Sequence, residues 1–543
     1  MNQIDTNRKT ALSSSLTHSL PQHLSWDGPE NSLAFDAENL RAQLLNLKSP
    51  LFAVNRNQEI GLTQEGRLAS NGAHALTAWL PAILPESLGN DGFKKTYRMR
   101  YALYGGAMAN GISSTRMVIA LGQAGMMGSF GAGGLIPAHI EDAIHKIQAE
   151  LPDGPYMFNL LNSPSEPAME RNAVELYLKY GVKNIEASAY LALTRSLVYY
   201  RASGLSQSPS GEIRIGNRII AKLSRKEVAR RFMEPAPEDM LSDLAAEGKI
   251  TPFQAELAKH VPMADDITAE GDSGGHTDNR PLVALLPAML AYRDQIQEKY
   301  KYATPVRIGA GGGISTPASA LAAFMMGAAY VVTGSINQAC VESGASDHTR
   351  TLLAQAAMTD VTMAPSSDMF EMGVRVQVLK RGTLFPMRAS KLYELYSRYN
   401  SLDEIPDKER ETLETKIFQR GLDEVWSDTV AFFTARDPRQ IERAEKDPRQ
   451  KMALVFRWYL GLSSRWSNQG VPERKMDYQI WCGPSMGAFN DWVRGTALEK
   501  SANRHVADVN LQLLRGCAYL SRLRMLAMQG VHLPNSLANY IPE

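Results

Sequence analysis

Short apolar segments alternate with helical segments between about residue 100 and residue 345, and this alternation constrains the fold more than any other feature. The apolar segments are continuous, which is typical of strands in a parallel sheet that is covered on both faces. We identify eight strands: Tyr101–Ala107, Met126–Phe130, Tyr156–Leu161, Val182–Ala187, Ile219–Leu223, Ala264–Ala269, Val306–Ala310 and Tyr330–Gly334. Helices are predicted between them, for example at Glu166–Tyr180, Pro281–Tyr300 and Pro317–Met326. This pattern predicts an α/β protein with a (β/α)8 TIM barrel.

The segments on either side of the barrel predict further domains, because 543 residues are too many for one ordinary domain. We expect an N-terminal extension at residues 1–95, the barrel at residues 96–390 and a C-terminal helical domain at residues 391–543. Ser49–Leu62 reads as a hairpin within the extension. A long connection at residues 224–263 reads as an insert with two short helices around Gly248–Pro252, and we expect it to form a lid or docking surface beside the barrel mouth.

Charge and cysteine content narrow the class of protein. Fifty-eight basic against 57 acidic residues leave a formal charge of +1, so there is no electrostatic argument for a nucleic-acid partner. The three cysteines lie far apart without metal-ligand spacing, which argues against a disulfide framework and a metal site and for the reducing cytoplasm. The polar first 20 residues lack the apolar core of a signal peptide.

One uncharged stretch, Ile308–Val341, resembles a membrane segment in composition alone. Glycine and proline interrupt it, and its apolar core is shorter than the roughly 20 residues that a membrane-spanning helix needs. We therefore expect a buried helix and a buried strand here, and no membrane span.

In a barrel of this class, binding sites are built from the loops at the carboxyl ends of the strands. The segment after the first strand, with Ala107, Met108 and Ala109, either lets the backbone approach a flat ligand or makes a tight strand–helix turn. Asn159 on the third strand either hydrogen-bonds a planar ring or ribityl chain or caps the strand. Lys222 on the fifth strand needs a counter-charge or a ligand, because lysine is rarely buried alone.

The loops after the last two strands predict an anion site. The seventh strand leads into Gly311, Gly312 and Gly313, and the eighth leads into Gly334 and Ser335, each just before a helix. Free backbone N–H groups at a helix start attract anions. Barrels of this class often hold a phosphate at these two positions.

The loop after the sixth strand contains the candidate general acid, His276. The loop begins at Glu270, and Gly275 lies directly before the histidine. Imidazole titrates near neutral pH, so His276 can donate or accept a proton during turnover. Glu270 and Asp272 either orient the histidine or cap the loop. The acidic pair Asp265–Asp266 precedes the loop, and we expect one of the two to face solvent.

These residues together resemble the nitronate monooxygenase-like flavoproteins, which are FMN-dependent barrels that include the flavin-type bacterial enoyl-carrier-protein reductases. The loop of that family usually reads Glu-Ala-Gly-Gly-His-x-Gly. Here Asp272-Ser273 replaces the alanine and Asp278 follows Thr277, which leaves the local role of these acids open. The length, the N-terminal extension, the helical tail and the segment Asp368–Ala389 are more closely similar to the PfaD-type subunit of polyunsaturated-fatty-acid and polyketide synthases.

The resemblance implies a trans-acting enoyl reductase. FMN would accept hydride from a nicotinamide cofactor, which we take to be NADPH although no residue separates it from NADH, and pass it to the β-carbon of an enoyl thioester. His276 would protonate the α-carbon or stabilise the enolate. The implied cofactor-binding residues are Ala107, Met108, Ala109, Asn159, Lys222, Glu270, Gly275, Gly311, Gly312, Gly313, Gly334 and Ser335.

The implied partner is an acyl carrier protein that delivers the tethered substrate. The insert and the helical tail are the predicted docking surfaces, and the basic residues at the start of the insert either meet an acidic carrier or form a solvated helix face; they are Arg225, Lys226, Arg230 and Arg231. Three other functions remain open: oxidation of nitronates by the same flavin, a flavin-free sugar-phosphate isomerase or aldolase, and a non-catalytic scaffold. Substrate length and oligomeric state also remain open, with a homodimer as one option.

Overall fold

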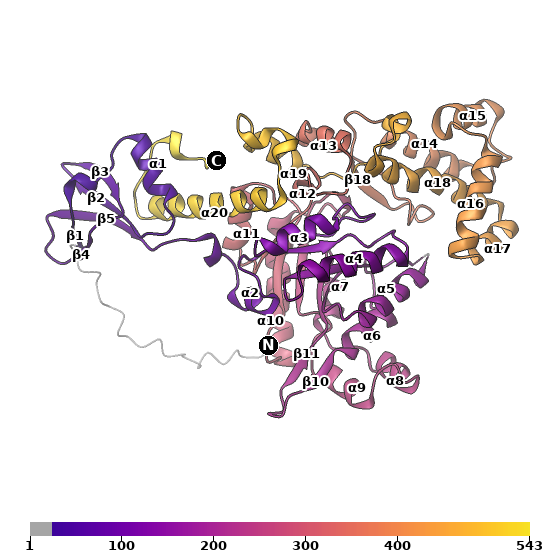
Figure 1. Cartoon of the computed structure of the whole chain (residues 1–543), viewed down its shortest axis with the longest axis horizontal. Coiled ribbons are helices and arrows are strands. Elements are labelled where there is room, and N and C mark those ends of the chain that lie inside the picture. The colour runs from indigo at the N-terminus through magenta and orange to yellow at the C-terminus, as the bar shows by residue number, and fades with distance from the viewer. Residues whose placement is uncertain (1–23, 165, 543) are drawn as a thin grey trace, which may run out of the picture. The chain divides into compact units, whose positions relative to one another are not determined.

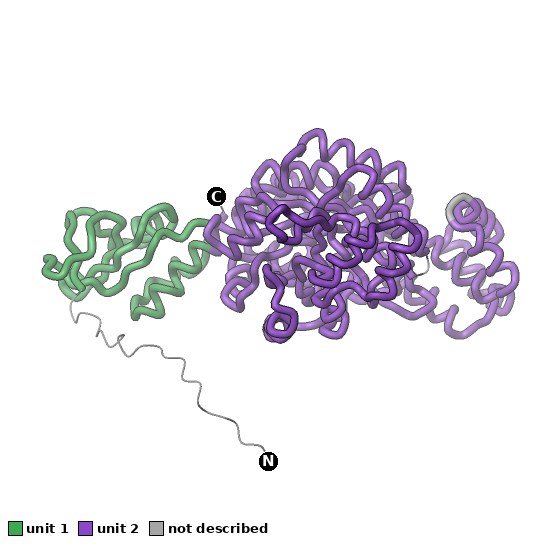
Figure 2. The backbone as a smooth tube through the Cα atoms, turned by 90° about the horizontal axis from the view of Figure 1, so that it is seen from below, with its two compact units in different colours: residues 1–84, 518–540 green, residues 85–517, 541–543 purple. Residues whose placement is uncertain are grey.

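The chain forms two compact units in the computed structural model, which describes residues 24–164 and 166–542 (Figure 1). The smaller unit joins the residues up to Leu84 with Ala518–Tyr540, and the larger contains Pro85–Cys517 and the last residues (Figure 2). The polar first 20 residues lie outside the described residues. The domain boundaries expected at residues 95 and 390 stay predictions.

The smaller unit is built on a five-stranded antiparallel sheet of order β3-β2-β5-β1-β4. Its strands are β1 (Ser25–Asp27), β2 (Leu51–Arg56), β3 (Glu59–Thr63), β4 (Arg67–Ala69) and β5 (His74–Leu80). The predicted hairpin is confirmed, because β2 and β3 pair antiparallel and turn at Asn57 and Gln58, whose φ angles are 52° and 69°. Trp26, Phe52 and Val54 are buried in its core.

The end of the chain contributes a buried arginine to the same unit. Arg522 belongs to α20 (Val506–Met528), and its Nη1 donates to the carbonyls of Gln43, Leu44 and Asn46 at 3.2, 3.3 and 2.8 Å. These carbonyls lie at the end of α1 (Ala37–Leu45), where a helix leaves its last acceptors without internal partners. Burial lowers the pKa of Arg522 to about 10. Arg522 therefore caps α1.

The larger unit contains a closed barrel of eight parallel strands, so the predicted fold class is confirmed. Around the barrel the order is β6-β7-β8-β9-β12-β13-β15-β16, and β16 pairs with β6. All eight predicted strands are present as β6 (Leu103–Gly105), β7 (Met127–Phe130), β8 (Tyr156–Leu161), β9 (Asn184–Ser188), β12 (Arg218–Leu223), β13 (Asp266–Glu270), β15 (Arg307–Gly311) and β16 (Val331–Thr333). Every residue of β7 and β15 is buried, as expected for strands covered on both faces.

Helices follow the strands as predicted. They are α3 (Thr115–Gln123), α4 (Pro137–Glu150), α5 (Pro167–Lys179), α6 (Arg195–Ser203), α7 (Lys226–Met233), α10 (Leu282–Tyr300), α11 (Pro317–Met325) and the short α12 (Ser335–Gln338). The uncharged stretch Ile308–Val341 folds as β15, α11, β16 and α12. No helix in the described part of the chain is long and apolar enough to cross a membrane.

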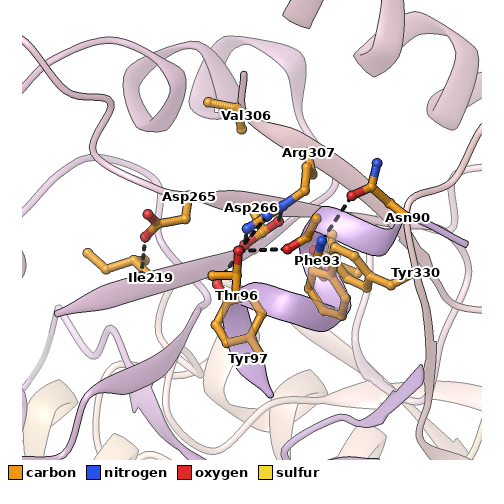
Figure 3. A network of polar contacts seen from close by, with 12 residues as sticks. Asn90, Phe93, Thr96, Tyr97, Ile219, Asp265, Asp266, Val306, Arg307 and Tyr330 are labelled. Atoms are coloured by element: carbon orange, nitrogen blue, oxygen red, sulfur yellow. Dashed lines mark hydrogen bonds and ion pairs between the residues drawn. The ribbon is translucent and has the colours of Figure 1, made fainter. Parts of the chain in front are cut away.

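The amino ends of the barrel strands hold a buried network of charges, drawn in Figure 3. Asp266 is fully buried, and its two carboxylate oxygens accept from Nε and Nη2 of Arg307 at 2.5 and 2.9 Å. Tyr97, on α2 (Asp91–Tyr97), donates its hydroxyl to the same carboxylate at 2.5 Å. Asp265 accepts from Arg201 at 2.7 Å, and only 12% of its side chain is exposed. The expectation that one acid of this pair faces solvent is therefore wrong, because distant arginines neutralise both.

The connection at residues 224–263 continues from α7 into α8 (Glu238–Ala246) and α9 (Pro252–Ala258), so the two predicted short helices are confirmed. Gln254 on α9 donates to the carbonyls of Ser203 and Leu205 at 2.9 and 3.5 Å. Ser203 ends α6, and a helix that follows one parallel strand runs back to the amino end of the barrel. The expected position of these helices beside the barrel mouth is therefore wrong, since α7 has already carried the chain to the other end.

Residues after 345 form further helices and a small sheet. The helices are α13 (Asp347–Ala354), α14 (Phe385–Arg398), α15 (Asp407–Thr412), α16 (Leu422–Arg436), α17 (Arg439–Lys446), α18 (Pro448–Gln469) and α19 (Ser485–Trp492), and a π-helix spans Leu413–Phe418. A hairpin of β17 (Val361–Pro365) and β18 (Arg375–Leu379) precedes α14. Val376 and Val378 of the hairpin pack in one core with Leu392 and Phe456, so the hairpin is anchored in the helical region.

Candidate active site

The carboxyl end of the barrel holds one lysine between two carboxylates. Lys222 Nζ on β12 is 3.6 Å from Glu186 Oε1 on β9 and 3.6 Å from Glu270 Oε1 on β13. Both strands are neighbours of β12, which brings the three side chains together. Burial alone would lower the pKa of Lys222, but the two carboxylates outweigh it and raise that pKa to about 12. The counter-charge that a buried lysine needs is thus supplied by the protein itself.

Glu186 is a site residue that our sequence analysis did not select. It is fully buried, and its Oε2 accepts a hydrogen bond from the amide of Ala107 at 2.8 Å. Its Oε1 receives no hydrogen bond from any described residue, although a buried carboxylate oxygen without a donor is costly. The sequence signal was a single acid in the strand segment NIEAS, at the centre of β9.

The loops after β6 and β7 lie in close contact. Met108 donates its amide to Ser113 Oγ at 3.0 Å, and a methyl group added at Gly131 would lie 1.8 Å from the Met108 carbonyl oxygen. Ala107, Met108 and Ala109 are each partly buried, so this loop keeps some accessible surface. Both interpretations of the segment are therefore compatible with its geometry: a tight turn that also presents backbone to a ligand.

Asn159 joins two neighbouring strands through its amide nitrogen. Nδ2 donates to the carbonyl of Glu186 at 3.0 Å and to Ser188 Oγ at 2.9 Å. Asn159 lies within β8, so these two bonds tie β8 to β9, and both the capping role and the ligand contact stay predictions. Oδ1 lies 3.5 Å from the place that a methyl group on Gly133 would take, and it is the atom through which Asn159 can contact a ligand.

The two glycine loops leave open space at their ends. Gly312 and Gly313 have φ angles of 78° and 76°, and a methyl group on Gly312 would lie 2.7 Å from the Gly271 carbonyl. A methyl group on Gly313 or Gly334 would meet no atom within 4 Å. Among the described residues, the amides of Gly313, Gly334 and Ser335 donate to no protein acceptor. This arrangement is typical of a backbone cradle for an anion.

His276 lies in a short strand, β14 (Gly275–His276), that pairs antiparallel with β18. Its Nε2 is 3.1 Å from Asp368 Oδ1 and 3.3 Å from Ser366 Oγ, and 36% of its side chain is exposed. Burial opposes protonation, but Asp368 and then Glu270 raise the pKa of His276 above its ordinary value. The imidazole is therefore suited to carry a proton at neutral pH.

The acids that depart from the usual loop pattern have structural partners. Asp272 accepts from Gln377 Nε2 at 2.6 Å and from Asn279 Nδ2 at 2.8 Å. Asp278 accepts from Arg225 through both of its oxygens, at 2.8 and 2.9 Å. The Arg225 guanidinium, with help from Ser224, holds the pKa of Asp278 at about 2. Both acids therefore fix the loop that contains His276.

The predicted basic docking surface on α7 is partly occupied by contacts within the protein. Arg225 is bound to Asp278, Arg230 lies 3.1 Å from Glu234, and Lys226 Nζ lies 4.6 Å from the centre of the Tyr292 ring. These side chains are not a free cationic patch, because each has an internal partner. All the predicted cofactor-binding residues, by contrast, lie at the carboxyl end of the barrel.

Three family profiles match different parts of the chain. The nitronate monooxygenase profile matches residues 94–394. The N-terminal domain of fatty acid synthase subunit PfaD matches residues 26–83. The inserted helical domain of [acyl-carrier-protein] S-malonyltransferase matches residues 399–478. The barrel, the small N-terminal sheet and the helices after α14 therefore each have a counterpart among known families.

Curated relatives and one solved structure are similar over most of the chain. A polyunsaturated fatty acid synthase subunit of Thraustochytrium sp. is 49% identical over 92% of this chain and 33% of its own length. Polyketide biosynthesis protein PksE of Bacillus subtilis is 48% identical over 82% of this chain and 58% of its own length. The enoyl reductase domain of MlnA, from the macrolactin biosynthesis cluster of Bacillus amyloliquefaciens, is 41% identical with a TM-score of 0.77, over 82% of this chain and 100% of that domain. The chain thus spans about a third of the Thraustochytrium synthase protein and under two thirds of PksE.

Proposed function

The chain belongs to the nitronate monooxygenase family, as its motifs predicted, and from this premise we propose that it is an FMN-dependent, trans-acting enoyl-thioester reductase. It takes hydride from NADPH and acts on chains tethered to an acyl carrier protein during polyunsaturated fatty acid or polyketide biosynthesis. The MlnA domain, which shares 41% identity and is described as an enoyl reductase, supports this reaction class. The synthase relatives support a carrier-bound substrate.

The residues at the carboxyl end of the barrel fit FMN. Gly313 and Gly334 leave space that a side chain would fill, and the amides there have no acceptor among the described residues, which suits the phosphate. Glu186 Oε1 has no hydrogen-bond donor in the described part of the chain, which suits an N–H of the flavin ring. Lys222 supplies a positive charge between two acids, where it can stabilise negative charge on the ring.

Bound FMN would supply hydride transfer from the nicotinamide to the β-carbon of the thioester. The protein's own part is to hold the substrate and deliver a proton. As the β-carbon gains its C–H bond, the electron pair of the double bond moves toward the α-carbon and the thioester carbonyl. His276 then gives its proton to the α-carbon, which completes the saturated thioester. The raised pKa of His276 keeps that proton available at neutral pH.

One observation carries the proposal: the imidazole of His276 lies on the barrel end that also holds the open glycine loops, with Lys222 and Glu270 near enough to shift its pKa. A proton donor and an anion cradle on the same barrel end are what a reductase of this class requires. A nitronate oxidase needs the same cradle, so the substrate must separate the two.

The test is an anaerobic two-step experiment on the purified protein loaded with FMN. NADPH should bleach the flavin absorbance, and an enoyl thioester on an acyl carrier protein should restore it with formation of the saturated thioester. A nitronate with oxygen is the comparison substrate. If no enoyl thioester restores the absorbance and the protein oxidises the nitronate rapidly, the protein is an oxidase and the reductase proposal fails.

A further inference from the structure

The hairpin of β17 and β18 holds the histidine loop from a distant part of the chain. β14, which contains His276, pairs with β18, and Gln377 on β18 binds Asp272 at 2.6 Å. Val376 and Val378, which alternate with Gln377, pack into the core of the helical region. The loop is therefore fixed at two points by a hairpin that is itself anchored in a packed core.

The loop between β17 and β18 presents a carboxylate and a hydroxyl to one nitrogen of the imidazole. Asp368 Oδ1 lies 3.1 Å and Ser366 Oγ lies 3.3 Å from His276 Nε2. Ser366 Oγ also donates to Asp368 Oδ1, which orients the carboxylate. Within the described residues, His276 Nδ1 makes no hydrogen bond. The two ring nitrogens therefore have different surroundings, one held by the protein and one available.

We propose that Asp368 is a positioning residue for the proton transfer: it accepts the Nε2–H of His276, fixes the ring orientation and tautomer, and leaves Nδ1 as the atom that protonates the substrate. This inference rests on the proposed enoyl reductase function. Asp368 itself touches no reacting atom in this scheme. It acts through His276, as a carboxylate that orients an imidazole acts in other enzymes.

The proton balance follows from this geometry. Hydride from the nicotinamide, carried by the cofactor, forms the β-carbon C–H bond, and the electron pair of the carbon–carbon double bond takes the proton from Nδ1 to form the α-carbon C–H bond. The imidazole that remains is neutral. It keeps its proton on Nε2 and donates a hydrogen bond from there to Asp368. Solvent then returns a proton to Nδ1. One hydride and one proton are consumed for each thioester reduced.

The charges around His276 agree with this arrangement. Burial and Lys222 on β12 lower the pKa of His276, whereas Asp368 and Glu270 on β13 raise it, and the net direction is upward. Burial opposes the ionised form of Asp368, but His276 and Ser366 hold its pKa well below the ordinary value. An ion pair between the two side chains accounts for both directions.

The first test compares Asp368→Asn with wild type in the step that consumes the enoyl thioester. At pH 7.5 we expect that step to slow about 10²-fold, within the range known for residues that orient a catalytic imidazole or ligand. The rate of this step falls as pH rises and His276 loses its proton. In Asp368→Asn that fall should begin about one pH unit lower than in wild type, because the imidazole loses its anionic partner. FMN content and flavin reduction by NADPH should stay at wild-type levels. Asp368→Glu should recover part of the rate, and Asp360→Asn, directly before β17, should change nothing.

The second test needs neither cofactor nor substrate. Diethylpyrocarbonate acylates neutral imidazole, so peptide mapping of the FMN-free protein at several pH values gives a protonation midpoint for His276. Asp368→Asn should lower that midpoint by about one unit, and Ser366→Ala should lower it less. His260, which lies on the surface beside Glu256, should keep its own midpoint in every variant.

The outcomes separate this inference from the proposed function. If wild type fails to reduce enoyl thioesters, the proposed function is lost, while the acylation midpoint still reports whether Asp368 holds His276. If wild type reduces them and His276→Ala does not, but Asp368→Asn keeps the wild-type pH profile and midpoint, the role of Asp368 is overturned. Should Asp368→Asn fail to fold, Ser366→Ala and Asp368→Glu must show the smaller shifts, and unchanged values in both would reject the inference.

Discussion

Both ends of the barrel hold buried carboxylates with a basic partner, but only at the amino end are those carboxylates fully hydrogen-bonded by the described residues. At the amino end, Asp266 and Arg307 form an ion pair with two hydrogen bonds, at 2.5 and 2.9 Å. The hydroxyl of Tyr97 donates a further hydrogen bond to the same carboxylate. At the carboxyl end, Lys222 stands 3.6 Å from each of two carboxylates. Glu186 there keeps an oxygen without a donor among the described residues. One network is complete within the protein, and the other is left incomplete.

This difference separates groups that stabilise the fold from groups that are available for a ligand. A buried charge that is fully paired and hydrogen-bonded has no capacity left for another molecule. A buried acceptor without a donor, on the same barrel end as glycines that face open space, retains that capacity. Burial and charge alone therefore do not identify an active site. The missing donor at Glu186 is informative because it lies on the barrel end that also holds the open glycine loops and His276.

The largest expected effect comes from removing the proton donor at the open end. His276→Ala should slow enoyl thioester reduction about 10²–10⁴-fold, the usual cost of losing a general acid. The unfolding temperature should fall only modestly, since 36% of the His276 side chain is exposed, although Asp368 loses its ion-pair partner. Stopped-flow absorbance of the flavin and a thermal melt check the two statements. Unchanged product formation would assign the chain to a scaffold instead.

At the amino end of the barrel we expect a substitution to lower stability instead of activity. Arg307→Met leaves Asp266 buried without its counter-charge, which should cost about 3–5 kcal/mol of unfolding free energy. Urea unfolding of the FMN-free protein measures it, because a bound ligand would add its own stabilisation. The double variant with Asp266→Leu should recover much of the loss. If the single variant is as stable as wild type, the amino-end network contributes nothing to the fold.

Much of the barrel could be predicted from the sequence because its strands are continuous apolar runs whose period and length differ from those of the helices. The hairpin at Asn57–Gln58 was predictable for the same local reason. The insert was misplaced because sequence gives the helices but not the direction in which α7 carries the chain. The acid pair was misread because its partners, Arg201 and Arg307, are 64 and 41 residues away.

The candidate site was predictable only in part. The glycine loops and the glycine-flanked histidine are recognisable from local composition, so Gly313, Gly334 and His276 could be selected. Asp368 is 92 residues from His276, and no spacing rule connects them. The segment Asp368–Ala389 was notable by resemblance, but its contact with the histidine loop depends on strand pairing between β14 and β18. Contacts of that kind are set by tertiary structure.

A smaller effect is expected from filling the open cradle. Gly334→Ala places a methyl group where no protein atom lies within 4 Å, so the fold should tolerate it. The same methyl group would take space proposed for the phosphate, and we expect FMN to bind about tenfold more weakly, or about 1.4 kcal/mol. Fluorescence titration of the FMN-free protein measures the affinity. Gly461→Ala on α18, which also meets no atom within 4 Å, is the matched control and should bind FMN as wild type does.

The last prediction tests whether the carboxyl-end charges stabilise the fold at all. Because the pKa of Lys222 is raised to about 12 in the folded protein, its ion pairs add stability that is present below the ordinary lysine pKa and lost as pH rises through 12. The size of that shift corresponds to about 2 kcal/mol. Lys222→Met should therefore cost less than Arg307→Met at pH 8, and the cost should begin to shrink above about pH 10.5. Lys222→Arg, which keeps the charge, should lose less. If urea unfolding instead gives Lys222→Met the same loss as Arg307→Met, then Glu186 and Glu270 depend on the lysine as Asp266 depends on its arginine, and the two ends of the barrel are equally closed.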